Sequence, residues 1–130
     1  MKRAALLLAT VAILAACKSV PTDIPDDLSQ AELIQLAQES ADSESWDAAI
    51  AYYQAVIDRF PQDPNAAVTA QYEMGFIEYK RGNSAEAADI FEQILALYDF
   101  EKDDLPQWPR ILSARLYAEL TAETETTAEE

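Results

Sequence analysis

The sequence predicts an all-α fold in which helical hairpins repeat along the chain. Between residues 28 and 121, apolar residues recur three and four positions apart, as on the buried face of an α-helix. Several of them recur again at a constant offset of 38 positions, which indicates two successive copies of one structural unit. Capping residues, prolines and a glycine divide this segment into the expected helices.

The first hairpin is expected between residues 28 and 60. Ser29-Gln30-Ala31-Glu32 is a capping box, in which the serine hydroxyl and the glutamate carboxylate bind otherwise unpaired amides at a helix start. The helical pattern breaks at residues 42–45, and Ser45 is a candidate cap for the second helix. The apolar face comprises Leu33, Leu36, Ala37, Trp46, Ala49, Ile50, Tyr53, Val56, Ile57 and Phe60.

The second hairpin is expected to begin at Asp63-Pro64. The aspartate can cap a helix there, and a proline in the first turn sacrifices no hydrogen bond. Gly82 can end this third helix, because glycine readily adopts the left-handed conformation found at helix ends. A fourth helix is expected to start at Asn83, with Glu86 three residues further on.

A fifth helix, roughly Pro109 to Thr121, is expected to cap the array. Its one-sided apolar pattern is formed by Ile111, Leu112, Leu116 and Leu120. Trp108 stands just before this helix and can fill the gap that precedes it. Residues 122–130 are acidic and threonine-rich with no apolar anchor, so a disordered tail is expected there.

The offset of 38 residues relates six pairs of positions. The pairs are Ala37 and Gly75, Ala49 and Ala87, Ile50 and Ala88, Tyr53 and Phe91, Ile57 and Leu95, and Phe60 and Tyr98. The second unit, Ala70-x-Tyr72-x-Met74-Gly75-x-Ile77-x-Tyr79-x-x-Gly82-x-x-x-Glu86-Ala87-x-x-x-Phe91, resembles a tetratricopeptide repeat. The first unit matches in Trp46-x-x-Ala49-Ile50-x-x-Tyr53 and is weaker in its first helix.

This resemblance implies two repeats and a capping helix in a right-handed solenoid, with residues 28–121 as the domain. Gly75 and Ala87 would let two antiparallel helices approach closely. An unrelated helical bundle is the alternative. Two repeats are few, because each hairpin buries its apolar face only against a neighbour. Either the fifth helix or a second copy of the chain completes the array, and the oligomeric state is left open.

The first sixteen residues resemble a bacterial secretion signal. Lys2 and Arg3 precede an apolar run that is shorter than the roughly 20 residues needed to span a bilayer. The run ends in Leu14-Ala15-Ala16-Cys17, which resembles the lipobox of bacterial lipoproteins. The resemblance implies cleavage after residue 16 and lipid on Cys17. An ordinary signal peptide followed by a free cysteine is the alternative.

The position of the mature chain in the envelope follows from the same resemblance. Lys18, in place of an aspartate, resembles the sorting signal for the outer membrane, on its periplasmic side. Residues 17–27 contain prolines and several acids and are expected to form an extended tether. The connection Phe60-Pro61-x-Asp63-Pro64 is similar to that of repeat lipoproteins of outer-membrane barrel assembly and to Tol-Pal-associated repeat proteins.

Composition argues against several classes of function. The chain carries 24 acidic and 9 basic side chains, a formal net charge of −15, and such a surface repels nucleic-acid phosphates. There is no histidine, and the single cysteine is assigned to lipid, so metal and catalytic sites lack their usual residues. Asp103 and Asp104 are paired carboxylates in an expected loop, with no set of basic and polar residues assembled around them as catalysis would need. We therefore expect no enzyme activity, no cofactor and no metal.

The expected function is that of an adaptor that binds other envelope proteins. In tetratricopeptide arrays the first helices of successive hairpins line a groove that holds a partner polypeptide. The groove candidates here form one stripe of the third helix: Tyr72, Phe76, Tyr79 and Lys80. This stripe is either a partner-binding face, which aromatic hot spots suit, or a second packed face. An accessory subunit of barrel assembly and a structural envelope tether are alternative roles.

Overall fold

The computed structural model describes residues 20–100 and 105–128. Within them the chain forms five α-helices and no strand. The helices are α1 (Gln30–Asp42), α2 (Trp46–Arg59), α3 (Pro64–Arg81), α4 (Ser84–Phe100) and α5 (Gln107–Ala128). The expected signal segment 1–16, the expected lipid-bearing Cys17 and the acidic pair at residues 103 and 104 lie outside the described residues.

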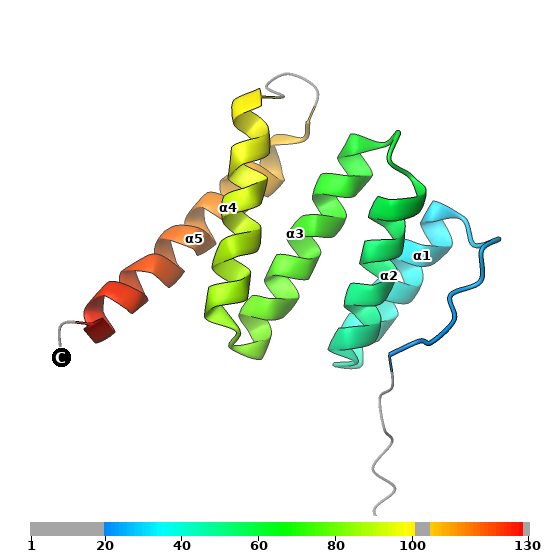
Figure 1. Ribbon diagram of the computed structural model, residues 1–130, viewed down its shortest axis with the longest axis horizontal. Coiled ribbons are helices and arrows are strands. Elements are labelled where there is room, and N and C mark those ends of the chain that lie inside the picture. Colours follow the sequence, from blue (N-terminus) through cyan, green and yellow to red (C-terminus); the bar gives the residue numbers. More distant parts are fainter. Residues whose placement is uncertain (1–19, 101–104, 129–130) are drawn as a thin grey trace, which may run out of the picture.

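The helices form an array in which each packs on its neighbours in sequence (Figure 1). α1 and α2 make one hairpin, α3 and α4 make a second, and α2 packs on α3 to join them. α5 lies against α4 and touches α3, as expected of a capping helix. The prediction of an all-α helical-repeat fold is confirmed. Among the described residues, no helix is both long and apolar enough to cross a bilayer.

Three helix boundaries form as the sequence predicts. The Ser29 amide donates to Glu32 Oε2 at 2.8 Å, and the Glu32 amide donates to Ser29 Oγ at 3.3 Å, which completes the capping box of α1. Asp63 Oδ1 accepts from the Ala66 amide at 3.0 Å and so caps α3, with Pro64 in the first turn. Gly82 ends α3 with a left-handed φ of 80°.

The starts of α2 and α4 differ in detail from the prediction. Ser45 stands immediately before α2, but its side chain makes no cap hydrogen bond, and its Oγ lies 3.2 Å from Ser43 Oγ. Glu44 has a φ of 56°, which is uncommon for a residue with a side chain and makes the turn tight. Asn83 precedes α4, and its side-chain amide donates to the Glu78 carboxylate of α3.

The interior consists of two clusters, and α3 contributes to both. The first joins α1, α2 and α3 through Leu33, Ala37, Ala49, Tyr53, Ala55, Val56, Ala70 and Ile77. The second joins α3, α4 and α5 through Val68, Tyr72, Ala87, Phe91, Ile94, Tyr98, Leu105 and Leu120. α3 is therefore apolar on two sides. One side packs on the first hairpin, and the other packs on α4 and the capping helix α5.

Burial repeats with the 38-residue offset. Ala49 and Ala87 are both fully buried, and Tyr53 and Phe91 are 3% and 0% exposed. Gly75 is the position equivalent to the fully buried Ala37 in the second repeat. It lies so close to α4 that an added Cβ would come within 2.9 Å of the Phe91 ring. The small residue at this position is thus required by the approach of α3 and α4, as predicted.

The end of the segment before α1 differs from the prediction of an extended tether over residues 17–27, of which residues 17–19 lie outside the described part of the chain. Arg59 Nη1 donates to the Pro25 carbonyl at 2.6 Å, and Arg59 Nη2 donates to the Ile24 carbonyl at 2.8 Å. The Ile24 and Leu28 side chains pack on the first cluster. These contacts hold the segment from Ile24 onward against the first hairpin, because a guanidinium can serve two carbonyl groups at once.

α5 differs from the prediction in its buried face and in its length. Its inward positions are Pro109, Ser113, Leu116 and Leu120, at helical spacings of four, three and four. Ile111 and Leu112, which were assigned to this face, are 65% and 36% exposed. The helix also begins at Gln107 and continues to Ala128, so residues 122–128 are helical and the prediction of a disordered tail from residue 122 is wrong for them.

Candidate functional site

A cavity of about 160 Å³ lies between α1 and α3, the first helices of the two hairpins. It is lined by Gln38, Ala41, Asp42, Trp46, Tyr53, Glu73, Phe76, Ile77 and Lys80. We call it the α1–α3 cavity. Its position matches the groove that the repeat resemblance implies for a partner polypeptide.

The lining of the α1–α3 cavity combines a tyrosine with two carboxylates, one on the half-buried Glu73 and one on the exposed Asp42. Tyr53 reaches it from α2 and is only 3% exposed, and Glu73 of α3 is half-buried. Desolvation and the nearby charges of Glu73 and Asp42 raise the pKa of Tyr53 above its ordinary range, so its hydroxyl remains a donor. Burial likewise raises the pKa of Glu73, because loss of water penalises the carboxylate.

The rim of the cavity carries a lysine held by aromatic rings. Lys80 Nζ lies 5.0 Å from the centre of the Trp46 ring and 5.9 Å from that of Phe76. Such cation–π contacts stabilise an ammonium group without a carboxylate partner. Within the described residues, no ion pair joins Lys80 to Glu73 or Asp42.

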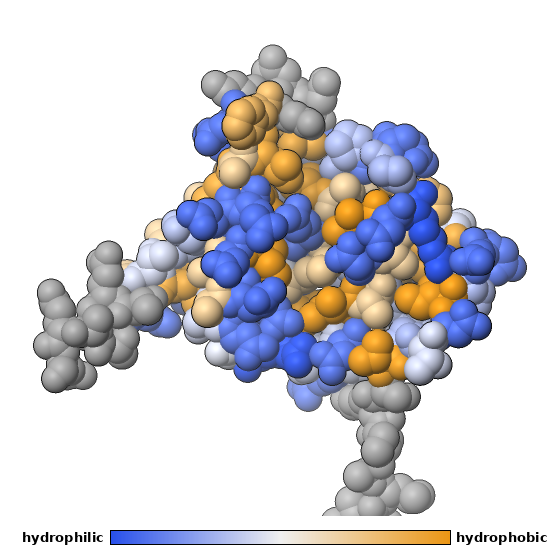
Figure 2. All heavy atoms as spheres, in the orientation of Figure 1, coloured by the Kyte–Doolittle hydropathy of each residue, from blue (hydrophilic) through white to orange (hydrophobic). Residues whose placement is uncertain are grey.

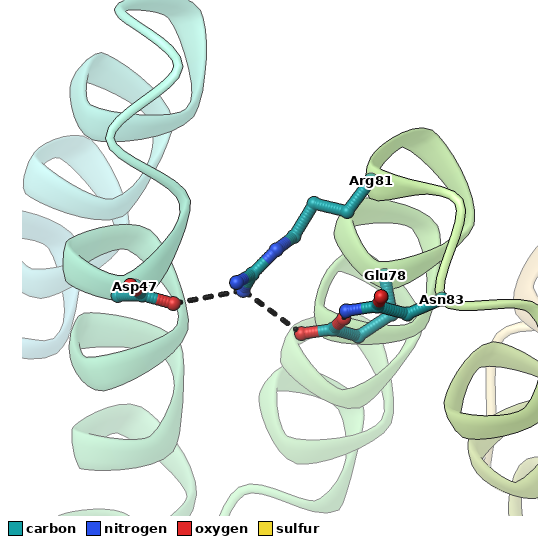
Figure 3. Close-up of polar contacts among 4 residues, drawn as sticks. All are labelled: Asp47, Glu78, Arg81 and Asn83. Carbon is teal, nitrogen blue, oxygen red and sulfur yellow. Dashed lines mark hydrogen bonds and ion pairs between the residues drawn. The ribbon is translucent and has the colours of Figure 1, made fainter.

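An adjacent polar network links the two hairpins beside this rim. Arg81 Nη1 donates to Asp47 Oδ1 of α2 at 2.8 Å and to Glu78 Oε1 of α3 at 3.2 Å (Figure 3). Asn83 approaches the other Glu78 oxygen, so this mostly buried carboxylate is fully engaged. Trp46 and Lys80 directly precede the Asp47–Arg81 pair in sequence, so the same bridge positions the rim.

The structure separates the stripe that the sequence proposed as a groove. Tyr72 is 7% exposed and belongs to the second cluster, with Trp108 edge-on to its ring at 5.1 Å. It is a core residue, which corrects its assignment to a partner-binding face. Trp108 was expected just before the fifth helix, in the gap that precedes it; it lies instead in the first turn of α5 and is 40% exposed, although its ring contacts Tyr72. Phe76 stacks on Tyr72 with ring centres 6.1 Å apart and is half-buried.

The other end of the stripe divides between two surfaces. Tyr79 is half-buried, packs on the second cluster and donates through its hydroxyl to Glu119 Oε1 of α5 at 2.8 Å. It therefore braces the capping helix. Lys80 is exposed and lines the α1–α3 cavity together with Phe76. Of the four proposed groove residues, these two lie where a partner in the cavity would touch them.

Sequence reasoning did not assign Trp46, Tyr53 and Glu73 to the candidate site. Trp46 and Tyr53 were placed among the core positions of the first hairpin, and Tyr53 is indeed almost fully buried. Nothing in the sequence around Glu73 distinguished it from other acidic residues of a helix. An acidic residue on a helix is normally expected to face solvent, and only the neighbours of Glu73 in the structure show that it is half-buried. The heptad-like spacing of Glu73 and Lys80 is the one signal that could have joined them to one face.

Figure 2 shows hydrophilic and apolar patches interspersed over this face of the molecule, and one apolar patch lies at the end of α4. There Phe100 is 87% exposed and Leu97 38% exposed. In residues 20–100 and 105–128, no group of three or more histidine, cysteine, aspartate or glutamate side chains is arranged to hold a metal ion.

Comparison with known proteins agrees with this architecture. Residues 33–63 and 69–99, one segment in each hairpin, match the family model described as tetratricopeptide repeat. An uncharacterized protein of Treponema pallidum (strain Nichols) is 36% identical over 101 residues, which cover 76% of this chain. The chain spans only 40% of that relative's length. No solved structure shows a significant match to the chain.

Proposed function

Since the chain carries two tetratricopeptide repeats, we propose that it is a protein-interaction scaffold held at a bacterial envelope membrane by lipid on Cys17. Repeats of this family bind other proteins, and the array supplies the surface for it. The observation that carries the adaptor role is the α1–α3 cavity, whose exposed Lys80 and half-buried Phe76 and Glu73 lie between the first helices of both repeats.

The membrane anchor is supported by the residues at the beginning of the chain. A basic start, an apolar run and Leu14-Ala15-Ala16-Cys17 have the order of a lipoprotein signal. Arg59 holds the chain at Ile24, seven positions after Cys17. An extended chain spans at most about 3.5 Å per residue, so a lipid on Cys17 would keep the first hairpin within about 25 Å of the membrane surface.

Anchoring is tested by labelling with a radioactive or clickable fatty acid in the native cells. The wild-type chain should take up label and partition with membranes, because acyl chains supply about 0.8 kcal/mol per buried methylene. Cys17→Ser should lose both. Ser19→Ala, a small change two positions away, is the control. Fatty acid on the Cys17→Ser variant would refute the anchor.

The adaptor role is tested separately by photo-crosslinking in intact cells. A photo-reactive residue replaces Gln38, which is exposed at the α1–α3 cavity, or Gln93, which is exposed on α4 outside it. A discrete crosslinked protein is expected from position 38 and not from position 93. Equal yields from both, or none from position 38, would refute a partner site in this cavity.

The identity of the captured protein separates the narrower roles. A component of outer-membrane barrel assembly would favour the accessory-subunit role, to which the Phe60-Pro61-x-Asp63-Pro64 connection points. A structural tether relying on the chain end would instead lose function when residues 122–130 are deleted. The adaptor should tolerate that deletion, since the α1–α3 cavity is formed by α1, α2 and α3.

A further inference from the structure

We propose that the α1–α3 cavity is a subsite for one basic side chain, arginine or lysine, of the bound partner polypeptide. This inference rests on the proposed function and adds to it the chemistry of the partner. It is carried by a tyrosine hydroxyl that opens into the cavity without a hydrogen bond from the described residues, two carboxylates without a counter-ion, and apolar walls around them.

The first observation is the Tyr53 hydroxyl. The Tyr53 side chain is 97% buried, lines the cavity and forms no hydrogen bond with any described residue. The hydroxyl oxygen is not one of the fully buried unpaired atoms of the described residues, so this polar tip of a mostly buried side chain is accessible from the cavity. A group that enters the cavity can bind there, because the tyrosine oxygen can accept a hydrogen bond from a guanidinium or ammonium.

The second observation is the unbalanced charge of the wall. Neither Glu73 nor Asp42 forms an ion pair or a side-chain hydrogen bond with another described residue. Lys80 is the one basic residue of the lining, and its ammonium is directed over the Trp46 and Phe76 rings. The carboxylates are therefore left for a cation from outside. The half-buried Glu73 gains more from such a partner than the exposed Asp42, because its carboxylate has lost part of its water.

The cavity also has the size and the walls for a basic side chain. Its volume of about 160 Å³ is roughly ten times what one water molecule requires. Ala41, Phe76 and Ile77 supply apolar surface against which the aliphatic stem of arginine or lysine can lie. Tyr53 and Glu73 supply the polar groups of the lining. The charged head group of an arginine or lysine can therefore lie against these two residues while its aliphatic stem lies against the apolar ones.

The charge of the whole chain favours the same partner. A formal net charge of −15 attracts basic segments over distances of about a Debye length and repels acidic ones. Long-range attraction alone would not select a site. The α1–α3 cavity adds a position at which one cation can be desolvated and hydrogen-bonded.

The test uses the full chain in detergent with two small probes, N-acetyl-arginine amide and its neutral isostere N-acetyl-citrulline amide. Binding is followed by NMR of the tyrosine rings, and Tyr53→Phe assigns the Tyr53 signals among the six tyrosines. The arginine probe should shift the Tyr53 signals saturably. The citrulline probe, which lacks the charge, should not.

Three variants separate a site from general charge attraction. Glu73→Gln should weaken the arginine probe by about fivefold, as expected for loss of a partly exposed ion pair. Glu86→Gln removes the same charge from an exposed position on α4 and should leave the affinity unchanged. Lys80→Met, which keeps an apolar stem and removes the native cation, should strengthen binding.

Several results would overturn the inference. They are equal shifts from both probes, equal weakening by Glu73→Gln and Glu86→Gln, and absence of a Tyr53 response at tens of millimolar arginine probe. Melting curves of the variants show whether each remains folded. Crosslinking from position 38 together with a failed arginine titration would leave the adaptor role standing and remove only the basic subsite.

Discussion

The backbone of Gly75 lies directly against the ring of Phe91. A Cβ atom at position 75 would stand 2.9 Å from Phe91 Cε1 and 2.9 Å from Ile90 Cγ2. Contacts this short do not occur between carbon atoms that are not bonded, so α3 and α4 could not keep their present spacing with a larger residue there. The second hairpin therefore depends on this glycine.

Gly75→Leu should destabilise the fold by about 1 to 3 kcal/mol, the usual cost of forcing extra carbon atoms into a packed interior. Thermal and urea unfolding measure the change. Ala96→Leu, at an exposed position on α4, is the matched control and should stay near the wild-type value. A Gly75→Leu variant as stable as the wild type would contradict the close approach of the two helices.

The Asp47–Arg81 bridge should couple the two hairpins weakly and in a salt-dependent manner. A double-mutant cycle with Asp47→Ala and Arg81→Ala should give a coupling of about 0.2 to 1 kcal/mol, because Asp47 is half-exposed and Arg81 about a quarter exposed. The coupling should shrink at 1 M salt, where charges are screened within about 3 Å. Additive effects of the two changes at low salt would exclude a contribution from this bridge.

The split of the aromatic stripe predicts different outcomes for its members. Tyr72→Ala should cost about 3 kcal/mol of folding stability, since it removes a buried ring from the second cluster. Lys80→Ala should change melting little, because a cation–π contact at an exposed site contributes about 0.5 to 1 kcal/mol. It should instead alter partner capture. Tyr72→Ala melting like the wild type would return this residue to the list of surface candidates.

Glu73 makes stability depend on pH in a defined direction. Burial raises its pKa in the folded chain above the ordinary 4.5, so its favourable contribution is complete below that value and is lost as pH rises through the folded pKa. Glu73→Gln should therefore be more stable than the wild type at pH 7, with the difference disappearing in acid. Glu86→Gln, measured over the same pH series, corrects for loss of one negative charge. A difference that is the same at every pH would show that Glu73 is not desolvated.

The sequence predicted the helices well because their signals are local. The capping box at Ser29, the cap at Asp63 and the left-handed Gly82 each act within a few residues, and all three form as expected. The repeat offset added one long-range fact, the equivalence of Tyr53 and Phe91. Together these were enough to place both hairpins.

The errors concern relations between segments that are distant in sequence. Arg59 fixes the chain at Ile24, thirty-five positions earlier, and no local pattern indicates which carbonyl groups a surface arginine will reach. Ser113 of α5 is fully buried, although a serine in an amphipathic helix is normally expected to face solvent. The α1–α3 cavity likewise exists only once α2 brings Tyr53 between α1 and α3.

The central claim is that a partner contacts the chain at the α1–α3 cavity. The most direct test measures the crosslinking yield at position 38 in a variant whose cavity is filled by a larger side chain. Ala41 lines the cavity, so Ala41→Phe places a ring in its space, whereas Ala85→Phe adds the same ring at an exposed position on α4. Circular dichroism and melting confirm that both variants are folded. We predict that Ala41→Phe lowers the yield about tenfold, corresponding to 1.4 kcal/mol of binding, and that Ala85→Phe leaves it unchanged. An undiminished yield in folded Ala41→Phe would contradict the claim.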